Sequence, residues 1–296
     1  MPQSYKPFLV HLTARCRVSE NLVRLTFTGP ELGQFGTTCL DQRIKLVLGS
    51  RECVEELVER DDWLAWARSL PEDVRPCLRT YTVKAVRPMS KELDVDFVVH
   101  GTEGPASAFA VEAPIGAHIA VVGPVEDAPG SSSEGVAWAP GSASQVLIAG
   151  DETAVPAISN IVESLDPEMR GAVFLEVPSS GDIQDFTAPH GVTVNWLPRE
   201  SHAGTARGDL LYRAVQEWCD QNGIASSEKQ VDPDDSYDSS VLLWDEARRG
   251  NTDALYAWVA ADADTVARLR HEMRKKRGLP KDSSSFMGYW RMGVSL

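Results

Sequence analysis

Residues 145–165 of this chain read QVLIAGDETAVPAISNIVESL, and this stretch decides what kind of fold the second half adopts. The apolar run Gln145–Ala149 predicts a short buried strand, and residues 153–165 predict a helix after a tight turn. The alternation continues towards the C-terminus, with strands predicted over 172–177, 192–197 and 254–260 and helices over 209–220 and 262–277. Alternating strands and helices predict a parallel sheet with helices on its faces.

The residues before this stretch follow a different pattern, that of short strands with few helices. Residues 7–28 alternate in the manner of strands, with Phe8, Val10 and Leu12 on one face. Further strands are predicted over 44–48, 81–86, 93–99 and 118–122, with one helix over 55–70. Short strands separated by Gly/Pro turns predict a small antiparallel β-barrel in front of the α/β domain.

The two patterns predict two domains, a barrel over residues 1–125 and an α/β domain over residues 145–296. A chain of 296 residues is long enough to give each domain its own core. Residues 126–144 are rich in Gly, Ser, Ala and Pro and predict a flexible linker or surface loop. Residues 221–240 are polar and predict a solvated loop inside the second domain.

Composition narrows the class of protein. The formal net charge of −14 disfavours nucleic acid as a partner, because an acidic surface repels phosphate. No apolar run approaches the roughly 20 residues that cross a bilayer, and the N-terminus lacks the pattern of a secretory signal. We therefore expect a cytoplasmic protein that does not insert into a membrane.

The cysteines and histidines show none of the short spacings typical of metal sites. The five cysteines are scattered and odd in number, as expected for free thiols in a reducing compartment. The six histidines form no H-x-H or H-x-x-x-H pair. We therefore expect neither an iron–sulfur cluster nor a built-in metal site.

The segment RTYTVK, residues 79–84, at the start of a predicted strand, is the first candidate site. A bound flavin needs an aromatic surface for its ring, polar groups along its ribityl chain and a cation near its diphosphate. Tyr81, Thr82 and Arg79 supply these chemistries, and the planar guanidinium of Arg suits phosphate oxygens. The same residues also fit an ordinary strand with an exposed arginine and a packed tyrosine.

The segment DFVVHGTEGPASAFA, residues 96–110, is the second candidate site. A strand is predicted to end at His100, and a helix is predicted to begin near Pro105, a residue that suits a first helical turn. Small residues there let an anion approach the unpaired N–H groups at the positive end of the helix dipole: Gly104, Ala106 and Ser107. The segment predicts a cradle for a diphosphate, with a simple capped helix as the alternative.

Together, Arg79-x-Tyr81-Thr82 and His100-Gly101-x-x-Gly104-Pro105-Ala106-Ser107 resemble the FAD-binding signature of the siderophore-interacting proteins. That family comprises FAD-dependent ferric-siderophore reductases within the ferredoxin-reductase-like superfamily. Further blocks resemble the family in the same order, at residues 41–46, 150–158, 256–260 and 289–293. The resemblance covers nearly the whole chain.

The resemblance implies a role for each matching position. The flavin and its phosphates would be lined by Arg79, Tyr81, Thr82 and Val83. The diphosphate and adenosine side would be held by His100, Gly104, Ala106 and Ser107, and Thr153 would approach the flavin ring from the second domain. The nicotinamide side would be formed by Trp258, Ala260 and Ala261, at the carboxyl end of a parallel strand.

The activity that the resemblance implies is transfer of electrons from NADH or NADPH, through FAD, to a ferric siderophore, with release of Fe(II). Because ferric siderophores are commonly anionic, we expect cations at the substrate site, with Lys45, Lys84, Arg87 and Arg291 as candidates. Two positions depart from the family pattern. Lys84 stands where the family often has Arg, and Ala261-Asp262 stands where it has Gly-Glu, so that a methyl group could crowd the nicotinamide.

Glu176 closes a predicted strand at the position where a carboxylate can accept a hydrogen bond from a ribose 2′-hydroxyl. It would repel a 2′-phosphate, so it predicts a preference for NADH over NADPH. An ordinary surface glutamate is the alternative.

Two other functions stay open: an NAD(P)H-dependent reductase of free flavin, quinone or ferredoxin, and a non-catalytic protein that binds flavin or siderophore. A ferredoxin could also be the electron donor.

Overall fold

The structure, a computed structural model, describes residues 4–99, 101–102, 104–202, 204–224, 243–247 and 251–292. The chain divides into two compact units, and the division falls between Val136 and Ala137. This point lies inside the stretch 126–144 that the composition predicts as a connection.

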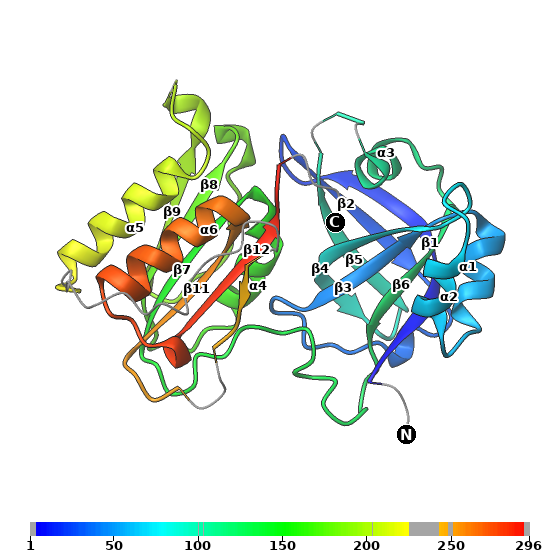
Figure 1. Cartoon of the computed structure of the whole chain (residues 1–296), viewed down its shortest axis with the longest axis horizontal. Coiled ribbons are helices and arrows are strands. Elements are labelled where there is room, and N and C mark those ends of the chain that lie inside the picture. Colours follow the sequence, from blue (N-terminus) through cyan, green and yellow to red (C-terminus); the bar gives the residue numbers. More distant parts are fainter. Residues whose placement is uncertain are drawn as a thin grey trace. The chain divides into compact units, whose positions relative to one another are not determined.

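The first unit contains a closed antiparallel barrel (Figure 1). Its strands are β1 (Tyr5–Arg17), β2 (Leu22–Thr28), β3 (Arg43–Leu48), β4 (Cys77–Arg87), β5 (Glu92–Val98) and β6 (His118–Pro124), in the order β1-β2-β5-β4-β3-β6. Alternate residues point inward, so that Phe8, Val10 and Leu12 of β1 lie in the barrel core. The predicted barrel is therefore confirmed.

Helices α1 (Arg51–Val58) and α2 (Trp63–Ser69) replace the single helix predicted over residues 55–70. The Ser50 hydroxyl accepts a hydrogen bond from the Cys53 amide and starts α1 four residues before the predicted start. Val54, Leu57 and Ala67 then pack in one cluster with residues of β6 on the outer face of the barrel. A turn between the two helices lets both bury their apolar residues against this curved surface, which one straight helix would not.

The second unit contains a sheet of strand order β10-β12-β11-β7-β8-β9. Its strands are β7 (Gln145–Asp151), β8 (Arg170–Val177), β9 (Gly191–Pro198), β10 (Trp244–Asp245), β11 (Leu255–Asp262) and β12 (Ser284–Trp290). All neighbours pair in parallel except β10, which runs antiparallel to β12. The predicted parallel sheet is confirmed, and β12 is a strand that the sequence pattern did not predict.

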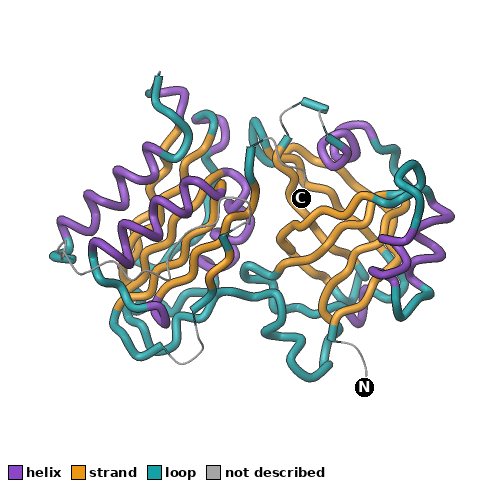
Figure 2. Tube along the Cα trace, in the orientation of Figure 1, coloured by secondary structure: helices purple, strands orange, loops and turns teal. Residues whose placement is uncertain are grey.

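Helices cover both faces of this sheet (Figures 1 and 2). Helices α5 (Asp209–Gln221) and α6 (Ala263–Arg270) pack on one face with alternate residues of β7, β8 and β11. Helix α4 (Val155–Glu163) covers the other face, where a Cβ atom on Gly150 would lie 2.7 Å from the Ile158 side chain. In the first unit, a further helix, α3 (Pro105–Glu112), follows β5.

Residues 137–144 belong to the second unit and are hydrogen-bonded to it, which favours the surface loop over the flexible linker for this part of the predicted stretch. The Tyr256 hydroxyl donates to the Ala137 carbonyl at 3.1 Å and accepts from the Ala139 amide at 3.2 Å. The Asn251 side chain donates to the Pro140 carbonyl at 3.0 Å. Of the predicted loop 221–240, residues 225–240 lie outside the described residues. Among the described helices, none is long and apolar enough to span a membrane.

Candidate functional site

Strand β4 carries the first candidate motif between β3 and β5. Ile44 is the register partner of Tyr81 on the β3 side, and Val95 is the partner of Val83 on the β5 side. The same register sets Tyr81 opposite Phe97, two residues beyond Val95 on β5, and the centres of these two rings are 4.3 Å apart. Burial raises the pKa of Tyr81, so its phenol stays neutral.

The second candidate motif begins where β5 ends. Gly104 has a φ of +90°, a left-handed conformation that favours glycine, and it lies directly before Pro105 in α3. No side chain caps this helix start among the described residues. A Cβ on Gly104 would meet no described atom within 4 Å, so none of the described residues fills the space beside this glycine. His100, which the resemblance places here, lies outside the described residues.

The barrel brings these two motifs to the same rim. Strands β4 and β5 are antiparallel neighbours (Figure 1), and their register places Arg79, near the start of β4, level with the end of β5, the strand that α3 follows in the chain. The rim offers a guanidinium, an aromatic side chain and an uncapped helix start with Ser107 in its first turn. These groups fit a flavin dinucleotide, whose diphosphate is anionic and whose ring is aromatic.

Three residues assigned to FAD by resemblance have buried side chains. Val83 is 0% exposed in the barrel core, and its amide donates to the Gln42 carbonyl at 3.0 Å. The Val83 side chain and amide are thus engaged within the barrel, and its implied place beside the flavin stays a prediction. The methyl group of Ala106 also packs in the core, so this residue offers a ligand only its backbone. Thr82 is buried as well, with 7% exposure.

In the second unit, Thr153 lies just beyond the carboxyl end of β7. Its amide and hydroxyl both donate to Oδ1 of Asp151, at 2.9 and 2.5 Å. Oδ2 of Asp151 accepts from the Asp262 amide at 2.9 Å and from the Trp290 indole at 2.8 Å. The buried Asp151 carboxylate thus ties together the ends of β7, β11 and β12. Sequence reasoning assigned it no role, although it lies in the matching block 150–158.

Two arginines lie beside the same carboxyl edge. Arg199 makes two hydrogen bonds with the Glu152 carboxylate, at 3.0 and 3.1 Å. Arg207 also pairs with Glu152, and its guanidinium lies 4.9 Å from the centre of the Trp290 ring. The edge where open α/β sheets bind their ligands therefore carries an aromatic ring and two arginines whose charges are balanced by the buried carboxylates of Glu152 and Glu176.

Glu176 does not face a ligand. It is 1% exposed, and its Oε1 accepts from the Gly208 amide at 2.8 Å and from Arg199 at 3.3 Å. Its Oε2 accepts from the Leu211 amide at 3.0 Å. The carboxylate therefore caps the start of α5, where an anion is favoured by the helix dipole. This contradicts the prediction that Glu176 binds a ribose hydroxyl. The predicted preference for NADH rested on that contact and loses its basis.

The residues assigned to the nicotinamide side are also buried. Trp258, Ala260 and Ala261 have 0% exposure. Trp258 packs edge-on against Tyr289 at 6.3 Å, and Ala261 lies in the core beneath α5 and α6. A central strand covered on both faces exposes little but its end, so the implied place of these residues at a nicotinamide entrance stays a prediction.

The candidate substrate cations differ in their surroundings. Lys45 is exposed on β3 and donates to the Thr80 hydroxyl at 3.1 Å. Partial burial and the nearby cations Arg43 and Arg68 lower its pKa. Lys84 lies half-buried on β4, close to Cys39.

Two further cations are paired with carboxylates. Arg291 belongs to the second unit, where it contacts Asp264 at 3.4 Å. Arg87 pairs with Glu92 and Asp94 at 2.7 and 2.6 Å and is therefore a poor candidate for a substrate anion.

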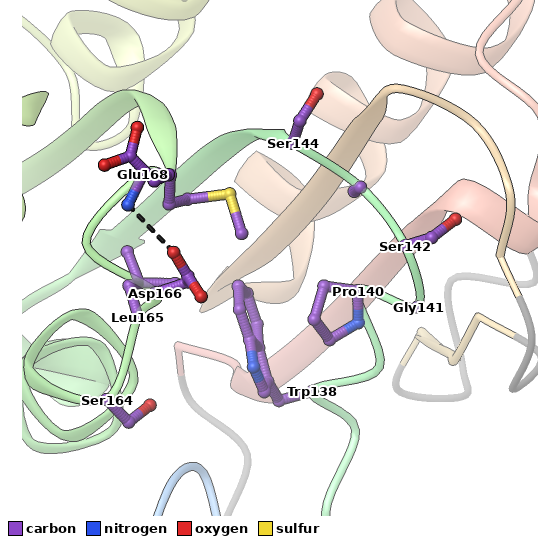
Figure 3. A pocket seen from close by; sticks show the side chains of 11 residues that line it. Trp138, Pro140, Gly141, Ser142, Ser144, Ser164, Leu165, Asp166 and Glu168 are labelled. Atoms are coloured by element: carbon purple, nitrogen blue, oxygen red, sulfur yellow. Dashed lines mark hydrogen bonds between the residues drawn. The ribbon is translucent and has the colours of Figure 1, made fainter.

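A cavity of about 420 Å³ lies at the opposite, amino end of the parallel sheet. Figure 3 shows Trp138 and Pro140 on one side of it and the turn between α4 and β8 on the other. Asp166 in this turn accepts a hydrogen bond from the Glu168 amide at 2.8 Å. The cavity contains none of the predicted site residues and lies at the end of the sheet where ligands are not expected.

Comparison with known proteins matches both units. Residues 11–128 match the family model described as siderophore-interacting FAD-binding domain, and residues 143–293 match the model described as siderophore-interacting protein. Ferric vibriobactin reductase ViuB of Vibrio cholerae is 28% identical over 289 residues, which cover 97% of this chain and 90% of that protein.

Solved structures show the same architecture. The siderophore-interacting protein SipS from Aeromonas hydrophila is 26% identical, with a TM-score of 0.67 over 99% of this chain and 94% of that one. The ferredoxin reductase in carbazole 1,9a-dioxygenase shares the fold at 13% identity, with a TM-score of 0.59 over 98% of this chain and 71% of that one. The barrel and the parallel sheet thus share the fold of that ferredoxin reductase, and the barrel matches an FAD-binding domain. The chain belongs to the siderophore-interacting protein family.

Proposed function

We propose that this chain is an FAD-dependent oxidoreductase that reduces ferric siderophores with electrons from NADH or NADPH and so releases Fe(II). Family membership and the similarity to a ferric vibriobactin reductase support the substrate class. The observation that carries the proposal is the barrel rim where the start of β4 meets the uncapped start of α3. In this proposal the barrel, over residues 1–125, holds FAD, and the α/β domain, over residues 145–296, binds the nicotinamide nucleotide.

The residues at the rim would divide the cofactor among them. Arg79 and the amides of Ala106 and Ser107 would hold the diphosphate, and Tyr81 would lie against the ring system. The chemistry that a bound FAD supplies is acceptance of two electrons from a hydride donor and release of single electrons to a metal. The protein chain itself contributes binding, orientation and local charge.

Reduction is a chemically sound way to release iron from a siderophore. Hard oxygen donors hold Fe(III) much better than Fe(II), so one-electron reduction loosens the complex. Most such complexes are anionic, whereas this chain has a net charge of −14 and needs a local cationic site. The neighbouring side chains of Lys45, Arg43 and Arg68 supply positive charge on the barrel.

The proposed electron donor is a nicotinamide nucleotide bound at the carboxyl edge near Thr153, Arg199 and Arg207. Because Glu176 is buried, it gives no reason to favour NADH, and both nicotinamides are candidates, with reduced ferredoxin as a third. We place the reaction in the cytoplasm, where the five unpaired cysteines would stay reduced.

The decisive experiment is an anaerobic assay of the purified protein reconstituted with FAD. NADH, NADPH and reduced ferredoxin are each tested for bleaching of the flavin, and ferric hydroxamate, catecholate and citrate complexes are then added with ferrozine to trap Fe(II). We expect a nicotinamide to bleach the flavin and at least one ferric complex to restore its colour. A folded protein that takes up no FAD contradicts the proposal, and one whose reduced flavin is oxidised only by quinone or ferredoxin favours the alternative reductase.

Two pairs of variants test the assigned residues. Arg79→Ala should lower the FAD content, whereas Arg75→Ala should not, because the Arg75 guanidinium contacts only its own loop at the Leu70 carbonyl among the described residues. Lys45→Ala should raise the KM for an anionic ferric siderophore without changing the FAD content. Lys6→Ala is its control, because Glu31 already neutralises Lys6. Equal effects of a variant and its control would remove that residue from the site.

A further inference from the structure

Two histidines face each other on the barrel of the first unit. His11 lies on β1 and His118 on β6, and they are register partners in the antiparallel pairing of these strands. Their ring centres are 5.6 Å apart, and the ring planes are inclined by 34°. The pairing of β1 with β6 brings together two histidines that lie far apart in the sequence, so no short histidine spacing reveals them.

The hydrogen bonds beside this pair explain the close approach. The Leu12 amide donates to the Ala117 carbonyl at 2.9 Å, and each of these residues is a direct chain neighbour of one histidine. In an antiparallel ladder, this bond identifies His11 and His118 as a non-hydrogen-bonded pair, the arrangement in which opposing side chains are closest.

Both imidazoles lie on the outer face of the barrel. The neighbouring residues Val10, Leu12 and Ile119 point into the barrel core, so alternation turns the two histidines outward. Both are half-buried. In the part of the chain that the structure describes, no hydrogen bond or ion pair involves either ring, so its nitrogen atoms are not occupied by another side chain.

We propose that His11 and His118 bind a divalent first-row transition-metal ion on the outer face of the barrel. Imidazole nitrogen is a good ligand for zinc, copper, nickel and iron, with zinc–nitrogen bonds of about 2.0–2.1 Å. With the ring centres 5.6 Å apart on two rigid strands, small rotations of the side chains bring one nitrogen of each ring to a shared ion.

The site is a two-ligand site. Among the described residues, no group of three or more His, Cys, Asp or Glu side chains could hold a metal ion, so water completes the coordination. Affinity should follow the usual order for nitrogen sites, with Ni²⁺ and Cu²⁺ bound more tightly than Fe²⁺. The inference does not depend on the proposed reductase activity.

The test is a titration of the untagged, FAD-loaded protein with Ni²⁺ and with Zn²⁺, followed by calorimetry. We expect one site, and we expect His11→Gln and His118→Gln each to weaken binding roughly tenfold or more. His190→Gln is the matched control, because this exposed histidine lies in the second unit, and it should leave the affinity unchanged. FAD content and circular dichroism report whether each variant folds.

A second measurement needs no variant. In an NMR spectrum of the histidine ring protons, substoichiometric Ni²⁺ should broaden two of the six histidine signals together and before the others. Assignment of those two signals to His11 and His118 supports the site. Broadening of other histidines first, no saturable binding, or binding that survives both substitutions would overturn the proposal.

Discussion

The carboxylate of Asp151 collects four hydrogen bonds at the carboxyl edge of the second unit. It accepts hydrogen bonds from the Thr153 amide and hydroxyl, the Asp262 amide and the Trp290 indole. Burial, and after it the neighbouring Glu152, raise the pKa of Asp151 to about 7. The folded protein therefore holds a proton on this group at a pH where the unfolded chain, with a pKa near 3.9, does not.

Asp151→Asn tests this raised pKa. Between about pH 4 and pH 7 the native state binds more protons than the unfolded state, so this group lowers stability as the pH rises, by at most about 1.4 kcal/mol per pH unit. From pH 5 to pH 7, the free energy of unfolding of the wild type should therefore fall relative to that of Asp151→Asn, which has no carboxyl group to titrate. Urea unfolding at pH 5, 6 and 7 measures it. A difference that stays constant from pH 5 to pH 7 would mean that the four donors keep the carboxylate ionised in the native state.

Gly150 precedes Asp151 at a point of close packing. A Cβ at this position would lie 2.7 Å from Ala154 Cβ and 2.8 Å from the Ala260 carbonyl oxygen, shorter than any ordinary contact. Gly150→Ala should therefore destabilise the protein by about 1–3 kcal/mol, as overpacking does. Gly33→Ala is the matched control, because a Cβ there has its nearest contact at 3.8 Å. Similar midpoints of thermal unfolding for the two variants would show that the start of α4 can move away from the added methyl group without loss of stability.

At the scale of elements, Glu272 connects α5 with the π-helical turn (His271–Lys276) that follows α6. Its side chain is 2% exposed, and it accepts from the Tyr212 hydroxyl of α5 at 2.9 Å and from Arg277 at 2.9 Å. Burial alone would raise the pKa of Glu272. Hydrogen bonds from Lys276, Tyr212 and Arg277 outweigh it and lower that pKa to about 2.

Glu272→Gln should destabilise the protein by about 2 kcal/mol at neutral pH, because it removes the buried carboxylate from its charge-assisted hydrogen bonds and leaves the Arg277 guanidinium to pair with the exposed carboxylate of Asp220 at 2.7 Å. A native pKa below the unfolded value gives stability that is present above about pH 4.5 and is lost as the pH falls towards 2. The gap between wild type and variant should therefore narrow between pH 5 and pH 3 in urea unfolding. The control is Glu56→Gln, which breaks an exposed pair with Arg60 and should cost less than about 1 kcal/mol. A constant gap at all pH values would argue against the charge as its cause.

The elements that the sequence predicted correctly are those whose hydrophobic period is local. The apolar run Gln145–Ala149 became β7, and residues 209–220 became α5, because each segment carries its own pattern. The predicted helix over residues 55–70 broke in two, since its packing partner is the curved outer face of a barrel formed by distant strands. Strand β12 was missed because it begins with Ser284 and Ser285, which are buried polar residues that a hydrophobic pattern does not reveal.

At the scale of the whole chain, the candidate site was predictable where a motif is contiguous. Gly104 and Pro105 indicate the start of a helix, and Arg79 and Tyr81 lie on one strand. Both parts of the candidate FAD site could therefore be predicted from the sequence. Glu176 could not be assigned, because its partners, the amides at the start of α5, lie more than thirty residues further along the chain. A carboxylate at a strand end looks the same in sequence whether it binds a ligand or caps a distant helix.

The net charge of −14 acts on the whole molecule and predicts how capture of an anionic substrate depends on salt. The Debye length falls from about 30 Å at 0.01 M salt to about 8 Å at 0.15 M. At low salt the acidic surface repels an anionic chelate over the whole approach, whereas the cations around Lys45 act only at short range. Salt therefore screens the repulsion more than the local attraction, and kcat/KM for an anionic ferric siderophore should rise over this range.

A neutral ferric hydroxamate is the control for this prediction, because its kcat/KM should change little with salt. Lys45→Ala should lower kcat/KM for the anionic complex at both salt concentrations, since it removes the short-range term and leaves the long-range repulsion intact. If kcat/KM for the anionic complex instead falls as salt is added, the cations on the barrel outweigh the net charge of the chain during approach. A rise with salt thus means that the net negative charge slows the approach of the anionic substrate, and a fall means that the positive surface around Lys45 attracts it.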